Sequence, residues 1–261
     1  MIPQAAITAW GRTRQWPTVE QIEQDLLLAR TLVAIYNNSV LRDELAFRGG
    51  TCLHQVHLPV PLRYSEDLDF VRRTHSGIGE IFDVLREVAE TVGLSVKTTE
   101  VGQFPKMKLQ ARAEVSGAPL RIKIEINTHE TSPAADLVSL PFGVESSWFT
   151  GYCTITTFSA AELVATKLRA LYERSKGRDL FDLWLALEQM SVAPKQILFC
   201  FVPYRPAGYT AAAAIDNLER KLASASFRND LNQLVGAWPT GYDIDVAGAL
   251  VVDQLLRHVD D

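Results

Sequence analysis

The segment from Leu120 to Asn127 is the feature that most constrains how this chain folds. Its apolar and polar residues alternate without interruption, with Ile122, Ile124 and Ile126 interleaved with Arg121, Lys123, Glu125 and Asn127. A period of two is the pattern of a β-strand with one buried face and one polar face. The segment therefore predicts a strand whose polar face, which carries Glu125, is available for chemistry.

Other patterns in the first 157 residues predict a mixture of helices and strands. A helix is expected over 18–37, because Thr18 can cap it, Gln21 completes a capping box and apolar residues follow at helical spacing. A second helix over 79–92 is stopped by Gly93. Strands are expected over 45–47, 68–71, 94–101 and 106–114, one or two helical turns over 52–58, and over 128–157 a loop with a short strand near 153–156.

The rest of the chain carries helical patterns. Ser159 can cap a helix that runs to about 174, with Glu162 three residues later. Further helices are expected over 178–190, 210–223, 227–235 and 246–259. The order predicts an α+β fold class, with a mixed-sheet α/β domain over 1–157 followed by an all-helical domain over 158–261.

The composition excludes several classes of protein. No apolar run approaches the ~20 residues that a membrane span needs, so we expect no membrane partner. The N-terminal sequence has no signal-peptide pattern, and the three cysteines are scattered, which favours reduced thiols and a cytoplasmic location. The formal net charge of -5 argues against a dedicated nucleic-acid binder, but a local basic patch would still be sufficient to bind RNA.

Asp67 and Asp69 are the strongest candidates for catalysis. They stand two apart in a predicted strand, so both project from one face while Leu68 and Phe70 turn into the core. Two neighbouring carboxylates repel each other unless a cation joins them. A hard divalent ion such as Mg²⁺ resolves that conflict, and Glu125 on another strand is the candidate third ligand. Two such ions can stabilise both oxygens of an in-line displacement.

Gly49, Gly50 and Thr51 lie between a predicted strand and a predicted helical turn. Glycines let backbone N–H groups approach a phosphate, and the Thr51 hydroxyl can donate to a phosphate oxygen. The spacing is not that of a P-loop, because no Gly-Lys-Ser/Thr follows. We expect these residues to hold the terminal phosphates of a nucleoside triphosphate, while Ser65 either contacts the nucleotide or shapes the turn before the strand.

A second group of charged residues stands in the helical half. Asp179 and Asp182 share one helical face at a spacing of three, and Lys167 lies on the preceding helix. A lysine neutralises triphosphate charge, and the forked Arg178 side chain suits a phosphate or a carboxylate. The alternative is that Lys167 and Arg174 form a solvated helix face and that Asp179 complements the helix dipole.

Simpler interpretations exist for other residues. Glu125 can pair with Lys123 or Arg121 instead of a metal ion. The spacing of Cys52, His54 and His57 fits no zinc pattern, and a packed helix explains it better. A set of basic residues predicts either an RNA-binding strip or a solvated sheet face: Lys97, Lys106, Lys108, Arg112 and Lys123.

These motifs resemble the AbiEii/AbiGii-type toxins, which are nucleotidyltransferase-like toxins of bacterial toxin–antitoxin and phage-defence systems, and their mycobacterial MenT-type relatives. The resemblance spans roughly residues 45 to 185, and the order and spacing of its motifs make it specific. The motifs are Arg48–Thr51 with Arg63–Phe70, Ile122–Ile126, Lys167–Arg174 and Arg178–Leu183.

The resemblance implies a nucleotidyltransferase fold core, Mg²⁺ (or Mn²⁺) and an NTP substrate. It implies transfer of a nucleotide to an RNA acceptor, in MenT-type relatives the 3′ end of tRNA, which blocks translation, and it implies a cognate antitoxin. By motif match, Asp67 and Asp69 are metal ligands, and Lys167 with Asp179 or Asp182 is essential for catalysis. The family has an Asp where this chain has Glu125.

Two other functions stay open at this point. The nucleotide acceptor is a protein hydroxyl instead of RNA, or the chain is a nucleotide-binding or antitoxin-binding module without turnover. The carboxylate set argues against the module, because a protein that only binds a nucleotide has less need of two metal ions.

Overall fold

The computed structural model describes residues 2–74, 77–102, 104–130 and 132–260. The chain divides into two compact units, each with its own core. Unit 1 comprises Met1–Ser132 and Leu137–Phe158, and unit 2 comprises Pro133–Asp136 and Ser159–Asp261. Within the described ranges, no helix combines the length and the apolar content needed to cross a membrane.

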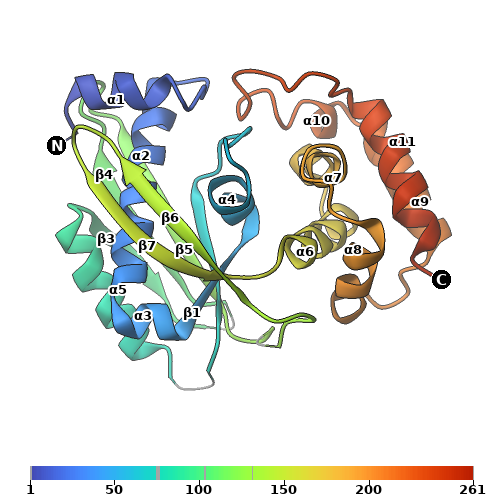
Figure 1. Cartoon of the computed structure of the whole chain (residues 1–261), viewed down its shortest axis with the longest axis horizontal. Coiled ribbons are helices and arrows are strands. Elements are labelled where there is room, and N and C mark those ends of the chain that lie inside the picture. The colour runs from blue at the N-terminus through green and yellow to red at the C-terminus, as the bar shows by residue number, and fades with distance from the viewer. Residues whose placement is uncertain (1, 75–76, 103, 131, 261) are drawn as a thin grey trace. The chain divides into compact units, whose positions relative to one another are not determined.

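Unit 1 is built on a mixed sheet, which has seven strands among the described residues (Figure 1). The strand order is β3-β4-β5-β2-β1-β7-β6. The strands are β1 (Leu45–Arg48), β2 (Asp67–Arg72), β3 (Ser95–Glu100), β4 (Lys106–Arg112), β5 (Pro119–Asn127), β6 (Val138–Glu145) and β7 (Thr150–Thr157). Strand β5 has the predicted alternation, since its isoleucines are buried and its charged residues are on the other face.

The strand pairing fixes which polar residues are neighbours. Strands β2 and β5 are parallel, as are β1 and β7, and the other pairs are antiparallel. In this register Asp67 stands beside Lys123, and Asp69 stands between Arg48 and Glu125. The sheet therefore brings together charged residues that lie far apart in the sequence.

Helices α2 (Val19–Asn37) and α5 (Gly79–Thr91) cover the apolar face of the sheet, with α1 (Gln4–Gly11) and α3 (Ser39–Glu44) beside them. Helix α2 begins with the predicted capping box, in which Thr18 and Gln21 exchange hydrogen bonds. The ring of Tyr36 on α2 packs against Phe70 on β2, with 6.4 Å between centroids. The short α4 (Gly49–Cys52) continues into the π-helical turn η1 (Leu53–His57) and contacts β2.

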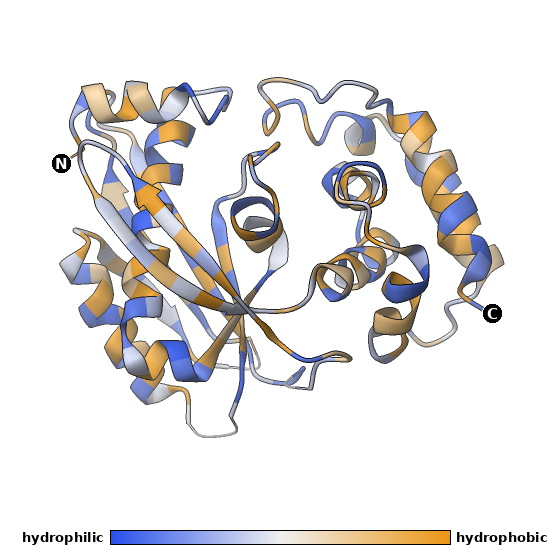
Figure 2. Cartoon of the chain, viewed as in Figure 1, coloured by the Kyte–Doolittle hydropathy of each residue, from blue (hydrophilic) through white to orange (hydrophobic). Residues whose placement is uncertain are grey.

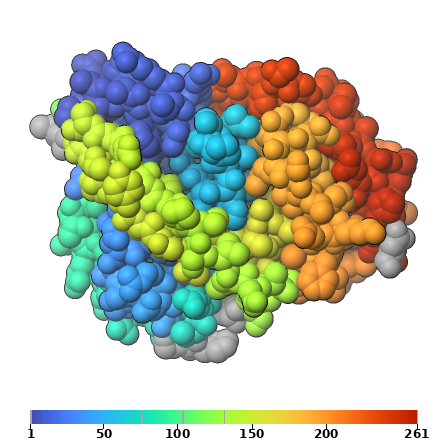
Figure 3. All heavy atoms as spheres, in the orientation of Figure 1, coloured from blue at the N-terminus to red at the C-terminus, as the bar shows by residue number. Residues whose placement is uncertain are grey.

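The β6–β7 hairpin is a correction to the sequence analysis, which expected a loop with one short strand. Pro141 and Gly143 interrupt the strand pattern of β6, but β6 is an edge strand, where a proline costs no ladder hydrogen bond. The ring of Tyr152 on β7 lies against Gly143 and fills the space that a side chain would otherwise take. Figure 3 shows the hairpin (yellow-green) exposed on one face of unit 1.

Unit 2 is helical, as expected. Its helices are α6 (Ala160–Glu173), α7 (Gly177–Glu188), α8 (Pro194–Phe201), α9 (Ala211–Leu222), α10 (Ala225–Arg228) and α11 (Ile244–Gln254), with 3-10 turns η2 (Val202–Tyr204) and η3 (Leu256–His258). Hydrophobic and hydrophilic residues alternate along α9 and α11 (Figure 2). The helix expected over 227–235 is wrong beyond Arg228, because the chain there forms successive turns instead.

The buried Glu162 ties the segment 133–136 to unit 2. Its carboxylate accepts hydrogen bonds from the backbone N–H groups of Ala134 (2.6 Å) and Ala135 (3.1 Å), and from the Tyr204 hydroxyl (2.6 Å). From its sequence position, Glu162 was expected only to contribute to the start of a helix. The structure adds a second task, since this carboxylate is fully buried and charge-assisted hydrogen bonds stabilise it.

Candidate active site

The polar face of the sheet in unit 1 carries the acidic residues that the sequence analysis selected. Asp67 and Asp69 lie on β2, and Glu125 lies on the neighbouring β5, directly beside Asp69. All three project from one face because residues two apart in a strand point the same way and the two strands are in register. The predicted juxtaposition of these carboxylates on separate strands is thus present.

A lysine occupies the position between two of these carboxylates. The Lys123 ammonium lies 3.0 Å from Asp67 Oδ2 and 3.3 Å from Glu125 Oε2. Glu125 is therefore paired with Lys123, the alternative partner that the sequence offered, and at the same time belongs to the acidic cluster. Among the residues that the structure describes, no three acidic, histidine or cysteine side chains enclose a common metal position.

Asp69 lies against the glycine turn. Gly49 has φ +84°, and a Cβ at this position would collide with the Asp69 carboxylate. Desolvation raises the pKa of Asp69, and the charge of Asp67 raises it further, while Lys123 and Arg48 lower it. Burial is the main cause of this shift and the neighbouring carboxylate adds to it, and an added cation would favour the charged form of Asp69.

Thr51 and Ser65 connect the glycine turn to the start of β2. The Thr51 hydroxyl donates to the backbone carbonyl of Asp67 at 2.5 Å and lies 2.9 Å from Ser65 Oγ. Because Thr51 is buried and its hydroxyl proton is used within the protein, the backbone N–H groups of the turn are better candidates than this hydroxyl for the expected phosphate contact. A Cβ at Gly50 would stand 2.5 Å from Arg63 Nη2 and 3.3 Å from Ser65 Oγ.

Gln24 supports this site, and the sequence analysis did not find it. Its side-chain amide accepts from Arg121 N (3.2 Å) and donates to Arg121 O (2.6 Å), and it also lies 3.4 Å from Glu66 Oε2. Strand β2 begins to pair with β5 at Asp67 and Lys123, so Arg121, two residues earlier on β5, has no partner on β2. The Gln24 side chain bonds the backbone of Arg121 in place of that strand. Gln24 lies roughly opposite the apolar stripe that predicted this helix (Ile22, Leu26, Ala29 and Val33), so the helical pattern gave no signal for it.

The second predicted group forms a buried ion cluster inside unit 2. The Lys167 ammonium lies 2.9 Å from Asp182 Oδ2 and 3.7 Å from Asp179 Oδ1. Arg174 binds Asp179 through two hydrogen bonds of 2.7 Å. Both aspartates are fully buried, so neither they nor Lys167 belong to a solvated helix face.

Arg178 differs from the other members of its motif. Its side chain is partly exposed, with Nε 3.9 Å from Asp230 Oδ2, and its backbone N–H donates to the same oxygen at 3.2 Å. The preceding Gly177 has no space for a side chain, because a Cβ would collide with the Phe227 carbonyl. The first residues of α7 therefore pack closely against the segment that contains Phe227 and Asp230.

The donor set of unit 1 suits a divalent metal ion. Carboxylate oxygens are the ligands that Mg²⁺ and Mn²⁺ prefer, and three of them line one sheet face. Lys123 already neutralises part of their charge, and its flexible side chain can move aside without any change in the sheet. The residues present therefore fit a metal ion held by Asp67 and Asp69, with Glu125 within reach on the next strand.

Comparisons with known structures find the same fold in other proteins. MenT4, a nucleotidyltransferase toxin from Mycobacterium tuberculosis H37Rv, is similar over 97% of this chain and 88% of its own, with a TM-score of 0.63 and 16% identity. JHP933 from Helicobacter pylori is similar over 93% and 94% of the two chains (TM-score 0.57, 16% identity). A putative nucleotidyltransferase from H. pylori covers 93% and 97% (TM-score 0.57, 18% identity). At these identities the likeness establishes the fold.

A comparison with curated proteins finds no match. The family model described as "Nucleotidyl transferase AbiEii toxin, Type IV TA system" matches residues 30–247, which includes every motif discussed above. This chain therefore belongs to the AbiEii family of nucleotidyltransferase toxins of type IV toxin–antitoxin systems.

Proposed function

We propose that this nucleotidyltransferase toxin uses Mg²⁺ to move a nucleotide from an NTP to an RNA acceptor, the 3′ end of tRNA, and thereby blocks translation. The observation that carries the proposal is the Asp67–Asp69 pair beside Gly49 and the Lys123 ammonium. Nucleotide transfer needs a cation that neutralises phosphate charge, and this is the position in unit 1 where carboxylates can hold one.

In this proposal Asp67 and Asp69 hold the metal ion, and Glu125 is a third ligand once Lys123 releases it. The ion supplies charge neutralisation at the phosphates and activation of the acceptor hydroxyl. Lys123 keeps the carboxylates together before the ion binds and offers its ammonium to phosphate oxygens afterwards. Mn²⁺ has the same ligand preferences and would replace Mg²⁺.

The glycine turn supports an NTP as the donor. The missing side chains let the Asp69 carboxylate approach Gly49 and let Ser65 and Arg63 approach Gly50, so a carboxylate, a hydroxyl and a guanidinium gather at this turn. Lys167, Asp179, Asp182 and Arg178 enter the proposal through the family motif. The motif implies that Lys167, with Asp179 or Asp182, is essential for transfer, and the Lys167 ammonium lies against both of these carboxylates.

The charge of the same sheet face supports RNA rather than a protein hydroxyl as the acceptor. Lys108 on β4 stands directly opposite Lys123 on β5, and their carboxylate partners are Glu100 for Lys108 and Asp67 with Glu125 for Lys123. A polyanion would add further negative charge beside this pair of cations. A hollow of about 350 Å³ adjoins Asp67 and is lined by Lys97, Lys108 and Arg121. A polyanion bound along these cations would reach the carboxylate site directly.

A transfer assay tests the proposal. The protein is incubated with each α-³²P-labelled NTP, total tRNA, total protein extract, and Mg²⁺, Mn²⁺ or Ca²⁺. We expect label in tRNA with Mg²⁺ or Mn²⁺, and loss of at least a hundredfold in rate for Asp69→Asn. Label in a protein band would favour the protein-hydroxyl alternative. If the Asp69→Asn variant were as toxic to cells as the wild type, the non-catalytic module would be favoured.

Charge reversal on the sheet face tests the RNA acceptor separately. The double variant Lys108→Glu with Arg121→Glu should weaken tRNA binding. It should also reduce the slope of log K against log salt concentration by about two, because two fewer counterions are released on binding. The matched control is Arg42→Glu with Arg86→Glu, two exposed arginines on helices α3 and α5. Equal weakening in both pairs would mean that only the net charge matters.

A cognate antitoxin and a cytoplasmic location complete the proposal. Both rest on the family, and on the substrates, because NTPs and tRNA meet in the cytoplasm. Co-expression of the neighbouring gene should restore growth and leave tRNA 3′ ends unmodified.

A further inference from the structure

A β-bulge on strand β3 sets the position of Lys97. Val96 pairs with Leu109 on β4, and Thr98 pairs with Lys108, so Lys97 is an extra residue between two regular pairs. A bulge places two residues of one strand against one residue of its partner and redirects a side chain. Lys97 and Thr98 both line the hollow of about 350 Å³ beside the candidate active site.

The cations of this hollow differ in how far they are neutralised. Lys108 and Lys123 both have carboxylate partners. Neither Lys97 nor Arg121 forms an ion pair or a side-chain hydrogen bond within the part of the chain that the structure describes, and both residues are exposed. Two positive charges therefore stand at the hollow without an ion-pair partner.

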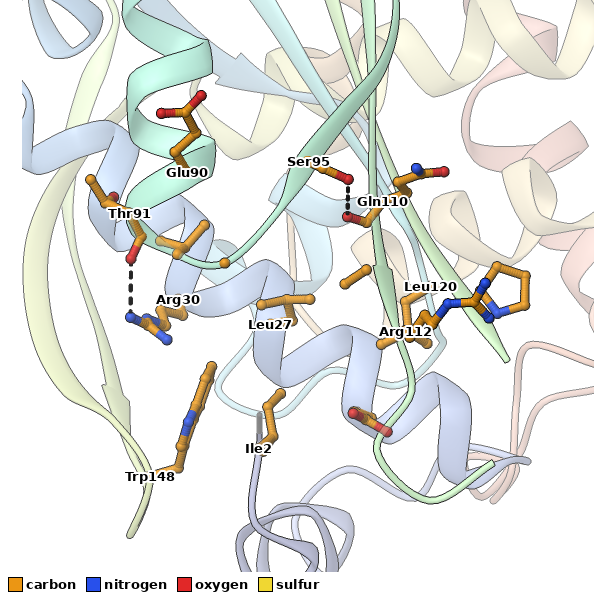
Figure 4. Close-up of a pocket in the computed structure, with 15 residues that line it drawn as sticks. Ile2, Leu27, Arg30, Glu90, Thr91, Ser95, Gln110, Arg112, Leu120 and Trp148 are labelled. Atoms are coloured by element: carbon orange, nitrogen blue, oxygen red, sulfur yellow. Dashed lines mark hydrogen bonds between the residues drawn. The ribbon is translucent and has the colours of Figure 1, made fainter. Parts of the chain in front are cut away.

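The larger cavity of unit 1 shows the opposite situation. It measures about 680 Å³ and lies between α2, the end of α5 and the strands β3 to β5 (Figure 4). Its wall also contains two arginines, but the protein uses both of them. Arg30 stacks on Trp148, with 4.6 Å to the ring centroid, and donates to the Thr91 carbonyl. Arg112 donates to the Gly117 carbonyl. The smaller hollow, in contrast, offers cations that have no such contacts.

The donors of the smaller hollow suit a phosphate group. A guanidinium offers a planar fork of N–H donors, an ammonium adds a compact charge, and a threonine hydroxyl can donate to an oxygen. Arg121, Lys97 and Thr98 supply one of each. Because Glu66 and Asp67 also line the hollow, its excess of positive charge is small, which suits a group with one negative charge better than a triphosphate.

The hollow and the glycine turn lie on opposite sides of Asp67. Gly49 lies against Asp69, two residues later on β2. Asp67 stands beside Lys123 on the parallel strand β5, and Arg121 lies two residues before Lys123, in the direction away from the turn. Two residues of a strand cover about 7 Å. A second anion can therefore approach Asp67 from the hollow while the phosphates of the nucleotide lie at the turn.

We propose that this hollow binds one phosphodiester of the acceptor RNA, the linkage nearest its 3′ hydroxyl, and that Lys97 and Arg121 hold it. The inference rests on the proposed transfer to an RNA 3′ end. One nucleotide separates a 3′ hydroxyl from the nearest phosphodiester of its strand, so a contact beside Asp67 holds the hydroxyl close to the metal ligands. Lys97 and Arg121 are thus positioning residues and take no part in the chemistry.

Short single-stranded RNAs that end in CCA test the proposal. The first has only charged linkages, the second has an uncharged methylphosphonate at the last linkage, and the third has it in the middle of the strand. All carry 2′-O-methyl sugars at both positions, which keeps the methylphosphonates stable. Binding to the full-length protein is measured by fluorescence anisotropy with Mg²⁺ and without NTP. We expect the neutral last linkage to weaken binding about threefold to tenfold, the range of one or two exposed charge contacts, and the neutral middle linkage to weaken it less.

Lys97→Met and Arg121→Met are the decisive variants. The matched control is Arg86→Met, an exposed arginine on α5, which covers the apolar face of the sheet. Each decisive variant should weaken binding of the fully charged RNA about threefold to fivefold and have no further effect when the last linkage is neutral, because the contact is then already absent. In transfer, the KM for RNA should rise by the same factor while the KM for NTP stays unchanged. All three variants should keep the wild-type melting temperature.

The proposal is overturned if Lys97→Met weakens binding equally for the charged and the neutral last linkage, if none of the RNAs binds, or if the KM for NTP rises instead. Transfer of labelled nucleotide to the fully charged RNA is measured separately. A wild-type protein that shows the coupling between Lys97 and the last linkage but transfers no nucleotide would refute the proposed function and leave the phosphodiester subsite in place. Transfer without that coupling would do the reverse.

Discussion

The contact between Gly49 and Asp69 gives a prediction whose magnitude follows from the structure. Gly49 and Gly93 both have a positive φ of nearly the same size, +84° and +82°. A Cβ at Gly93 meets nothing within 4 Å, whereas one at Gly49 meets the Asp69 carboxylate. Gly49→Ala and Gly93→Ala therefore share the cost of the left-handed backbone and differ only in the collision.

The left-handed backbone costs an alanine about 1–2 kcal/mol, partly offset by the reduced freedom of the unfolded chain. The collision adds roughly 1–3 kcal/mol at Gly49, because Asp69 sits on a central strand and cannot retreat freely. We expect Gly93→Ala to lower the free energy of unfolding of unit 1 by about 1 kcal/mol, and Gly49→Ala by about 2–4 kcal/mol.

Urea unfolding measures this difference, with hydrogen exchange of β2 and β5 reporting on unit 1. Nucleotide transfer should fall steeply in Gly49→Ala, since Asp69 has to move, and stay near wild type in Gly93→Ala. Equal destabilisation in the two variants would refute the reasoning, because it would mean that Asp69 does not press on the glycine turn.

Three further predictions concern residues outside the metal ligands. Burial lowers the pKa of His57 to about 4, whereas in the unfolded chain it is near 6.5, so the unfolded state binds a proton more readily. The free energy of unfolding is therefore highest above pH 6.5 and falls by roughly 1–3 kcal/mol as the pH drops to 4. His57→Phe should remove that fall from the wild-type minus variant difference in urea unfolding, and an identical pH dependence would contradict the assignment. Gln24→Leu should cost about 2–4 kcal/mol, because both backbone groups of Arg121 lose their partner; unchanged protection of β5 in hydrogen exchange would count against this. Arg174→Met should destabilise unit 2 by about 1–3 kcal/mol, since Asp179 loses its two short hydrogen bonds and keeps Lys167 at 3.7 Å and the charge of Lys221; a thermal midpoint equal to wild type would show that the pair contributes nothing.

The sequence predicted correctly those helices and strands whose structure depends mainly on their own residues. The alternation in β5 and the capping box of α2 are local features, and both are present in the structure. The mixed-sheet fold class is confirmed. The β6–β7 hairpin was not predictable in the same way, because only its position at the sheet edge makes Pro141 and Gly143 acceptable.

The candidate site shows the same division. Asp67 and Asp69 could be found because two residues in one strand share a face. The position of Lys123 between Asp67 and Glu125 depends on the parallel register of β2 and β5, which the sequence does not specify. Gln24 was missed for a similar reason, since its role depends on the backbone groups of Arg121, which have no partner on β2 in the strand register.

The buried Glu162 carboxylate limits how this protein can be divided or recombined. Two of its donors belong to residues 134 and 135, which precede the β6–β7 hairpin in the chain. A fragment that begins at Ser159 would leave this charge with only the Tyr204 hydroxyl among those donors. Exchange of the helical half between relatives should therefore succeed only when the short segment 133–136 is exchanged with it, so a chimera needs two junctions more than a simple head-to-tail fusion.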